Sequence, residues 1–217
     1  MLYSCARSVV GERASVFNSS KRGKRKSVYA KNVKNSLINM ALFATYQTVL
    51  APKLQDAFAI TNVLAVPRLV KVTVNVGVGK HLREDKDIEY VEKIVTRITG
   101  QKPIRMKAKK SISSFKVRKG MVVGIVATLR GKRMYDFVEK LIHITLPRVR
   151  DFRGLEPKSV DAHGNCTIGF KEYSAFPETR SDEVERLHGL EVTFVTNAKT
   201  RERGMALFKA FGLPFKN

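Results

Sequence analysis

The stretch from residue 101 to residue 133, QKPIRMKAKKSISSFKVRKGMVVGIVATLRGKR, combines the two patterns that decide the fold of this chain. It holds eleven Lys or Arg residues and no Asp or Glu. Its alternating apolar positions are Ile104, Met106 and Ala108, then Ile125, Ala127 and Leu129. This period of two predicts strands with one buried face and one basic face. Solubility does not require acids to be excluded, so the basic face is expected to bind a polyanion such as RNA.

Composition supports the same class of partner. The chain has 217 residues, a formal net charge of +22 and a pI of about 10.3, which favour nucleic acid first and an anionic membrane surface second. No apolar run approaches the ~18–20 residues that span a bilayer, so no membrane segment is predicted. The two cysteines, Cys5 and Cys166, lie too far apart in sequence to indicate a disulfide framework, which fits a reducing compartment.

Residues 1–39 are predicted to form a basic extension, and residues 40–217 the folded domain. The extension carries nine basic residues against the single acid Glu12. Its opening, 1–17, has the composition of an organelle transit peptide. The basic cluster 21–26 is equally typical of an RNA-binding arm or a nuclear signal.

Periodicity predicts the elements of the domain. Apolar residues four apart from Leu42 to Phe58 predict a helix that Pro52 should kink or split. The strand 69–78 places valines from Val70 to Val78 on one face and Lys71, Thr73 and Asn75 on the other. Further helices are predicted from Asp85 or Asp87 to Ile98, over 134–145 with a stop at Pro147, and over 200–211, and further strands over 166–172 and 190–196. The expected fold is α+β: one domain with a largely antiparallel sheet, helices packed on one side and a basic open face.

Residue patterns that carry catalysis are weak in this sequence. The stretch Gly77–Lys80 resembles a phosphate loop, but no Ser or Thr follows the lysine. His163 and Cys166 form one H-x-x-C pair without a second pair of ligands. We therefore predict no enzymatic activity, no metal site and no cofactor.

Several segments, in chain order, resemble one known family. They are 66–68 (VPR), 75–79 (NVGVG), 100–103 (GQKP), 107–120 (KAKKSISSFKVRKG), 128–131 (TLRG), 146–154 (LPRVRDFRG), 161–165 (DAHGN), 186–190 (RLHGL) and 210–215 (AFGLPF). Over residues 40–217 the chain resembles the bacterial-type ribosomal large-subunit protein five, the 5S-rRNA-binding protein of the central protuberance. Each motif alone would be weak, but the ordered set is specific.

The resemblance implies a structural constituent of the large ribosomal subunit that binds 5S rRNA, large-subunit rRNA or both. The implied rRNA contacts are Asn75, Gln101, Thr128 and Arg130. Lys71, Arg105 and Lys107 join this set because the alternation pattern places them on the basic face.

Two further segments are implied to reach other partners. The tract 107–120 resembles the family loop that contacts P-site tRNA, with candidate residues Lys109, Lys110, Ser111, Phe115, Lys116, Arg118 and Lys119. The tract 146–165 resembles the segment that bridges to the small-subunit head through its protein thirteen, with candidate residues Arg148, Arg150, Asp151, Arg153, Asp161, His163 and Asn165.

The extension 1–39 has no counterpart in typical bacterial members of this family. Its transit-like opening favours the mitochondrial matrix over the plastid stroma or the bacterial cytoplasm. In a ribosome without 5S rRNA, the same face would hold large-subunit rRNA or proteins that replace the 5S rRNA. Neighbouring central-protuberance proteins are further expected partners.

Two other functions stay open at this point. The first is a free RNA chaperone or regulatory RNA-binding module that uses the same basic sheet. The second is an RNA-processing enzyme, which would need an acid cluster near residues 101–133, where the sequence has no acid.

Overall fold

The structure, a computed structural model, describes residues 42–79, 85–179 and 188–216. The predicted extension 1–39 lies outside these ranges, as do Arg186 and Leu187 of the 186–190 motif. The boundary between extension and domain therefore stays a prediction.

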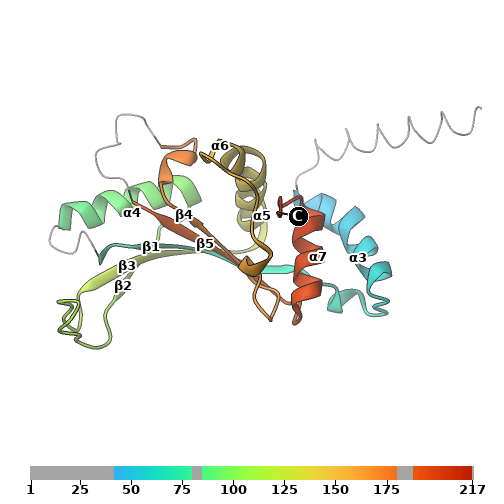
Figure 1. Cartoon of the computed structure of the whole chain (residues 1–217), viewed down its shortest axis with the longest axis horizontal. Coiled ribbons are helices and arrows are strands. Elements are labelled where there is room, and N and C mark those ends of the chain that lie inside the picture. The colour runs from blue at the N-terminus through green and yellow to red at the C-terminus, as the bar shows by residue number, and fades with distance from the viewer. Residues whose placement is uncertain (1–41, 80–84, 180–187, 217) are drawn as a thin grey trace, which may run out of the picture. The chain divides into compact units, whose positions relative to one another are not determined.

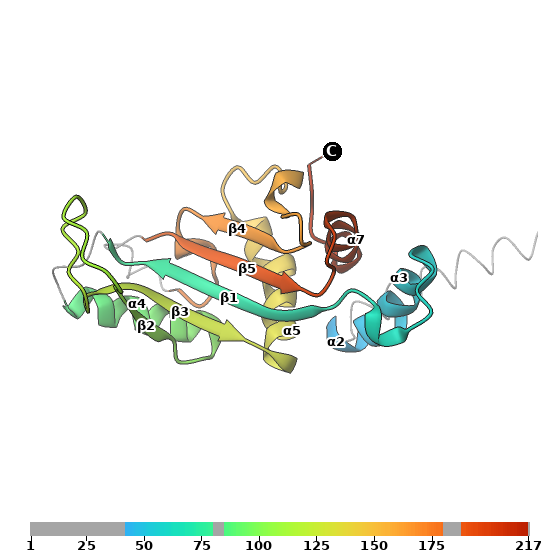
Figure 2. The same cartoon turned by 90° about the horizontal axis from the view of Figure 1, so that it is seen from below.

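The described part is built on one five-stranded antiparallel sheet in the order β2-β3-β1-β5-β4 (Figure 2). The strands are β1 (Leu69–Gly77), β2 (Ile104–Lys107), β3 (Val122–Leu129), β4 (Cys166–Phe170) and β5 (Leu190–Thr196). The long strand β1 occupies the centre, where it pairs with β3 on one side and β5 on the other.

The helices cover one face of this sheet. Helix α4 (Asp85–Thr99) packs against β1 and β3, and α5 (Gly131–Lys140) packs against β1 (Figure 1). Helices α2 (Leu42–Thr45), α3 (Ala51–Ala57) and α7 (Arg201–Phe211) gather near one end of the sheet. Short turns lie at η2 (Val63–Ala65), η5 (Pro157–Ser159) and η6 (Tyr173–Ala175). The predicted α+β fold, with an antiparallel sheet and helices on one side, is confirmed.

The core forms where the alternating apolar residues of β1 and β3 meet the helices. Val72, Val74 and Val76 are fully buried and pair with Leu129, Ala127 and Ile125 across the two strands. Val70, which the alternation assigned to the same face, is instead 46% exposed. The register of β1 against β5 shifts between Leu69 and Lys71, so Leu69 takes the buried position and Val70 becomes the extra residue of a bulge.

Pro52 does not split its helix. The chain continues from α2 through the π-helical turn η1 (Tyr46–Leu50) into α3, and the N–H of Ala51 donates to the carbonyl of Tyr46 five residues earlier. The same arrangement surrounds Pro147. Turn η4 (Leu141–Thr145) leads into α6 (Leu146–Arg148), so this helix also continues beyond its predicted end.

These π-turns have a common physical cause. A proline in an α-helix lacks an N–H, and its ring clashes with the carbonyl four residues back. A wider turn just before the proline moves that carbonyl away, so the chain stays helical on both sides of the turn. The two prolines therefore reshape their helices without interrupting them.

An aromatic cluster holds the first helical segment onto the rest of the domain. Tyr46 stacks with Tyr135 of α5 and Phe211 of α7, at ring-centroid distances of 6.1 and 5.8 Å. The Tyr46 hydroxyl donates to the Pro67 carbonyl at 3.0 Å just before β1. Helix α7 then ends at Gly212, whose φ of 90° forms a left-handed C-cap.

Candidate RNA interface

The sheet face opposite α4 and α5 carries a row of four threonines across four strands. Thr128, Thr73, Thr193 and Thr167 are successive cross-strand partners on β3, β1, β5 and β4. All four side chains are half-buried, and the Thr167 and Thr193 hydroxyl oxygens lie 3.3 Å apart. Because neighbouring strands lie ~4.8 Å apart, this row presents hydroxyl groups at regular intervals across the open face.

Asn75 lies in the next row of the same face. It pairs with Val126 on one side and with Glu191 on the other, and its Nδ2 donates to a Glu191 carboxylate oxygen at 3.3 Å. The structure thus brings Asn75 and Thr128, two predicted contact residues, into adjacent rows of one face. Their predicted RNA contacts are not tested by this placement.

Gln101 and Arg130 belong to the junctions that surround this face. Gln101 lies in the turn between α4 and β2, and its Oε1 accepts a hydrogen bond of 2.9 Å from Nη1 of Arg133. Arg130 directly follows β3 with extended backbone (φ −142°, ψ 163°) and is exposed at the start of α5. Lys71, near the start of β1, is half-buried and pairs with Val195.

Arg105 does not lie on the open face, contrary to the prediction. Its partner across the strands is Ile125, a core residue, and its guanidinium binds Glu92 of α4 on the helix side. Apolar and basic side chains do alternate in β2, but the basic Arg105 faces the helices and the apolar residues face outward. Lys107 follows a register shift, pairs with Val122 and is exposed at the end of the strand.

The reversal turns apolar side chains outward. Ile104 is 69% exposed and Met106 is 45% exposed, on the same face as Val126 and Gly124. Sequence analysis missed these residues as surface groups because it assigned every alternating apolar residue to the core. At this edge of the sheet the open face is therefore apolar, and the cations lie at its borders.

The predicted tRNA-binding tract forms a hydrogen-bonded hairpin that extends beyond β2 and β3 (Figures 1 and 2). Ile112 and Val117 exchange backbone hydrogen bonds of 2.9 and 3.1 Å. The Ala108 N–H donates to the Met121 carbonyl, and the Ala108 carbonyl accepts from the Gly120 N–H. The Ser111 hydroxyl accepts a hydrogen bond from the Lys119 N–H at 2.9 Å, so this serine also supports the hairpin.

The hairpin presents its charges to solvent. Phe115, near the tip, is 74% exposed, and the adjacent Lys116 has a positive φ of 54°. The other exposed cations of the tract are Lys109, Lys110, Arg118 and Lys119. A cationic projection with one exposed aromatic ring suits contacts to a nucleic acid backbone and an unstacked base.

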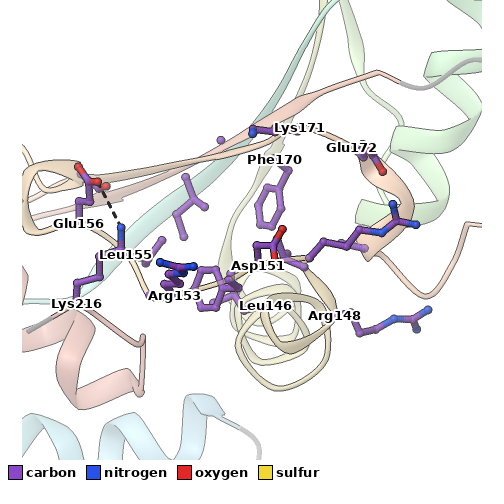
Figure 3. Close-up of a pocket in the computed structure, with 18 of the residues that line it drawn as sticks. Leu146, Arg148, Asp151, Arg153, Leu155, Glu156, Phe170, Lys171, Glu172 and Lys216 are labelled. Atoms are coloured by element: carbon purple, nitrogen blue, oxygen red, sulfur yellow. Dashed lines mark hydrogen bonds and ion pairs between the residues drawn. The ribbon is translucent and has the colours of Figure 1, made fainter.

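The predicted bridge tract divides into two parts in the structure. Arg148, Arg150, Asp151 and Arg153 line a groove of about 920 Å³ beside β4 (Figure 3). Asp161 and Asn165 instead form a tight turn, in which the Asp161 carboxylate accepts hydrogen bonds of 2.7 and 2.8 Å from the Asn165 backbone and side chain. His163 is exposed within that turn.

The turn at Asp161 is a structural element. Asn165 Oδ1 accepts from the Thr196 N–H at 3.0 Å, which attaches the turn to the end of β5. Burial alone would raise the pKa of Asp161, but hydrogen bonds from Asn165 and from the His163 backbone, together with the nearby His163 ring, lower that pKa below its ordinary value. We infer that the main role of Asp161 and Asn165 is to stabilise this turn, which their sequence motif alone does not reveal.

Cys166 lies in the core, at the start of β4. Burial, with Asp161 nearby, raises the pKa of its thiol to about 12, so the reactive thiolate is not populated near neutral pH. Within residues 42–79, 85–179 and 188–216, no three His, Cys, Asp or Glu side chains are placed to hold a metal ion. In the same ranges, no helix combines the length and hydrophobicity needed to cross a membrane.

Comparison with known proteins agrees with this architecture. The family model of ribosomal protein L5 matches residues 62–118, and the model of the C-terminus of the same ribosomal family matches residues 122–215. The chain belongs to the ribosomal protein L5 family. It is 49% identical over 172 residues to the large ribosomal subunit protein uL5 of Nostoc sp., and this alignment covers 79% of this chain and 94% of that protein.

Other relatives give the same result. The uL5 protein of Halothermothrix orenii is 49% identical over 170 residues, covering 78% of this chain and 95% of the relative. The uL5 protein of Desulfatibacillum aliphaticivorans is 48% identical over 171 residues, covering 79% and 96%. This L5 family member is therefore a structural, non-enzymatic protein of the large ribosomal subunit that acts in translation and assembles with rRNA and other ribosomal proteins.

Proposed function

We propose that this protein binds 5S rRNA, or the neighbouring large-subunit rRNA, in the central protuberance through the open face of its sheet. The observation that carries the proposal is the position of Asn75 and Thr128 in adjacent rows of the face opposite the buried valines of β1. These residues belong to motifs through which the chain resembles 5S-rRNA-binding relatives.

The chemistry of the face supports RNA over DNA. Threonine hydroxyls and the Asn75 amide can hydrogen-bond ribose 2′-hydroxyls and base edges. Arg130 and Lys71 lie at the border of the threonine row, where they can neutralise phosphates. The exposed Ile104 and Met106 supply apolar area for a ribose or base next to those contacts.

The hairpin around Phe115 is proposed to contact the P-site tRNA. Its two backbone-paired arms hold it away from the sheet, so its cations can reach a second RNA without disturbing the first. Lys109, Lys110, Lys116, Arg118 and Lys119 would contact phosphates, and Phe115 would pack on a base or ribose.

The groove-lining part of 146–165 is proposed to bridge to the small-subunit head through its protein thirteen. Exposed ion pairs are individually weak, so the mixed charge of Arg148, Arg150, Asp151 and Arg153 suits contacts that break and re-form as the subunits rotate. The transit-like opening of the chain supports a mitochondrial ribosome as the site of action.

The test is ultraviolet crosslinking of the protein in its native extract, followed by sequencing of the attached RNA. We expect crosslinks to 5S rRNA or adjacent large-subunit rRNA from the sheet, and to tRNA from the hairpin. Sedimentation with large subunits in high salt serves as a second measurement, because a binder that relies on phosphate contacts alone dissociates there. Crosslinks spread over messenger RNAs without an rRNA peak would support the chaperone function and refute this proposal.

A further inference from the structure

The groove of about 920 Å³ runs along the outer edge of β4 (Figure 3). Residues 167–171 form one wall, and residues 148–156 form the other. Its volume is at the upper end of the ~300–1,000 Å³ that is usual for small-molecule pockets, so it has room for several side chains. Both walls are continuous chain segments, so the groove has the shape of a slot for a third, extended segment.

β4 is a terminal strand of the described sheet, and β5 is its only strand neighbour there. A single bridge between Val160 and Cys166 covers the start of its outer side. Beyond that bridge, no backbone hydrogen bond joins residues 167–170 to a described residue outside β5. An uncovered strand edge offers backbone N–H and C=O groups to another strand, and proteins usually protect such edges.

The opposite wall is held in place by the C-terminal residues. The Leu155 N–H donates to the Pro214 carbonyl, and the Lys216 N–H donates to the Leu155 carbonyl, each at 2.8 Å. Gly154 has a φ of 96°, and an added Cβ there would lie 3.1 Å from the Lys216 nitrogen. The groove is therefore formed before any partner arrives, which lowers the entropic cost of binding.

The charge of the groove selects its occupant. The side chains of Arg148, Arg150, Arg153 and Lys171 make no hydrogen bond or ion pair with any residue that the structure describes. Two of the three acids have a partner: Glu156 contacts Lys216 at 3.5 Å, and Glu172 accepts from Ser174 at 3.1 Å. Asp151 is the one groove carboxylate without a side-chain partner among the described residues, so a ligand would meet four available cations and one available acid.

We propose that an extended, acidic peptide segment of a neighbouring protein binds in this groove and adds as a strand to the outer edge of β4. Backbone hydrogen bonds would supply affinity, and the four cations would select acidic side chains. Residues 1–39 of this chain are too basic to satisfy that selection. An RNA strand cannot form the strand-to-strand hydrogen bonds, and its phosphates would meet the carboxylates of Asp151, Glu156 and Glu172.

This inference rests on the proposed bridge, because it uses the same residues, Arg148, Arg150 and Arg153, and adds which kind of partner segment they bind. Its test uses the free, full-length protein, so that its failure is distinguishable from failure of the bridge on the ribosome. The probe is a fluorescent peptide of about nine residues in which Glu alternates with Thr, read by anisotropy and by amide NMR shifts of residues 167–171. One comparison peptide replaces every Glu by Lys, and another carries N-methyl groups on alternate backbone amides.

We expect saturable binding of the Glu peptide, with shifts at 167–171, and a loss of at least about tenfold in affinity for either comparison peptide. The double variant Arg150→Glu, Arg153→Glu should lose a similar factor. The matched variant Lys53→Glu, Lys93→Glu, with the same charge change on helices α3 and α4 outside the groove lining, should lose about twofold or less. Equal binding of the N-methylated peptide would overturn the proposal, because it would show attraction by charge alone.

Two other outcomes would also overturn it. Displacement of the peptide by a short RNA that itself shifts residues 167–171 would make the groove an RNA site. A concentration-dependent dimer that the double variant abolishes would make a second copy of this chain the occupant.

Discussion

Arg105 contacts Glu92 through two guanidinium nitrogens, Nε at 2.9 Å and Nη2 at 2.7 Å, and both reach the same carboxylate oxygen. This pair joins the edge strand β2 to helix α4 on the covered side of the sheet. The basic residues of 101–133 thus have two different roles. Some hold the fold together, and others border the open face.

The first prediction separates these roles. Replacing Arg105 by Ala should lower the free energy of unfolding by about 0.5 kcal/mol, because the pair is partly exposed, and should change rRNA affinity little. Replacing Arg130 by Ala should weaken rRNA binding by ~1–3 kcal/mol with little change in stability. Urea denaturation and filter binding measure the two quantities on both variants. An equal loss of rRNA affinity in both would mean that the Arg105–Glu92 pair opens on binding.

A second prediction concerns the hairpin. Changing Lys109, Lys110, Lys116 and Lys119 to Gln should leave incorporation into large subunits intact and weaken tRNA retention. Removing four phosphate contacts should also flatten the salt dependence of tRNA binding, by about 0.7–0.9 in the logarithmic slope for each contact. Quantitative sedimentation reports incorporation, and filter binding at several salt concentrations reports the slope. An assembly defect of similar size would show that the hairpin anchors rRNA instead.

The third prediction uses the lowered pKa of Asp161. Replacing Asp161 by Ala should cost about 1 kcal/mol near neutral pH, because hydrogen bonds within the turn are lost. A carboxylate with a lowered pKa stabilises the fold fully above its ordinary pKa of 3.8, and loses that contribution as pH falls through the folded-state value. The stability difference between wild type and variant should therefore shrink only below about pH 4.

Thermal denaturation at several pH values measures this difference. Asp136→Ala is the matched control, since Asp136 is exposed in helix α5 and its carboxylate makes no hydrogen bond with any described residue. A difference that shrank already between pH 7 and 5 would contradict the assigned role of Asp161.

The fourth prediction concerns a close backbone contact. A Cβ added to Gly204 of α7 would lie 2.5 Å from the Cα of Gly164, in the turn between Asp161 and Asn165. Gly204→Ala should therefore destabilise the protein by ~2–3 kcal/mol, because the new methyl group meets backbone atoms of Gly164, which cannot move aside as a flexible side chain could. Gly77→Ala, at the exposed end of β1 with no atom within 4 Å of its added Cβ, should change stability by less than ~1 kcal/mol. Chemical denaturation compares the two.

Sequence patterns predicted the buried face of the central strand β1 well, because pairing with β3 and β5 on its two sides fixes which face is covered. Val72, Val74 and Val76 have only one buried side to occupy, and alternation identified it. In β2 the same alternation separated two faces but could not tell which was covered. Pairing with Val126 and Gly124 turned Ile104 and Met106 outward, and only the register of the strands decides that.

The candidate site was predictable to a similar extent. Asn75 and Thr128 came from the family motifs, and the sheet brought them together. The salt bridge of Arg105 with Glu92 and the attachment of the Asp161–Asn165 turn to Thr196 join residues 13 and 31 positions apart in the chain. Local patterns do not encode such contacts, so charged and polar residues with structural tasks looked like surface residues available to partners.

The π-turn before Pro52 has a consequence for insertions and deletions. Deleting one residue within 47–50 would restore an ordinary helical turn, and it would rotate residues 42–46 by about 100° around the helix axis. Leu42 and Tyr46, now packed in the core, would swing toward solvent, and the ring of Tyr46 would leave Tyr135 and Phe211. The extra residue in the wide turn is therefore needed for packing: it sets the rotation that turns Leu42 and Tyr46 toward the core.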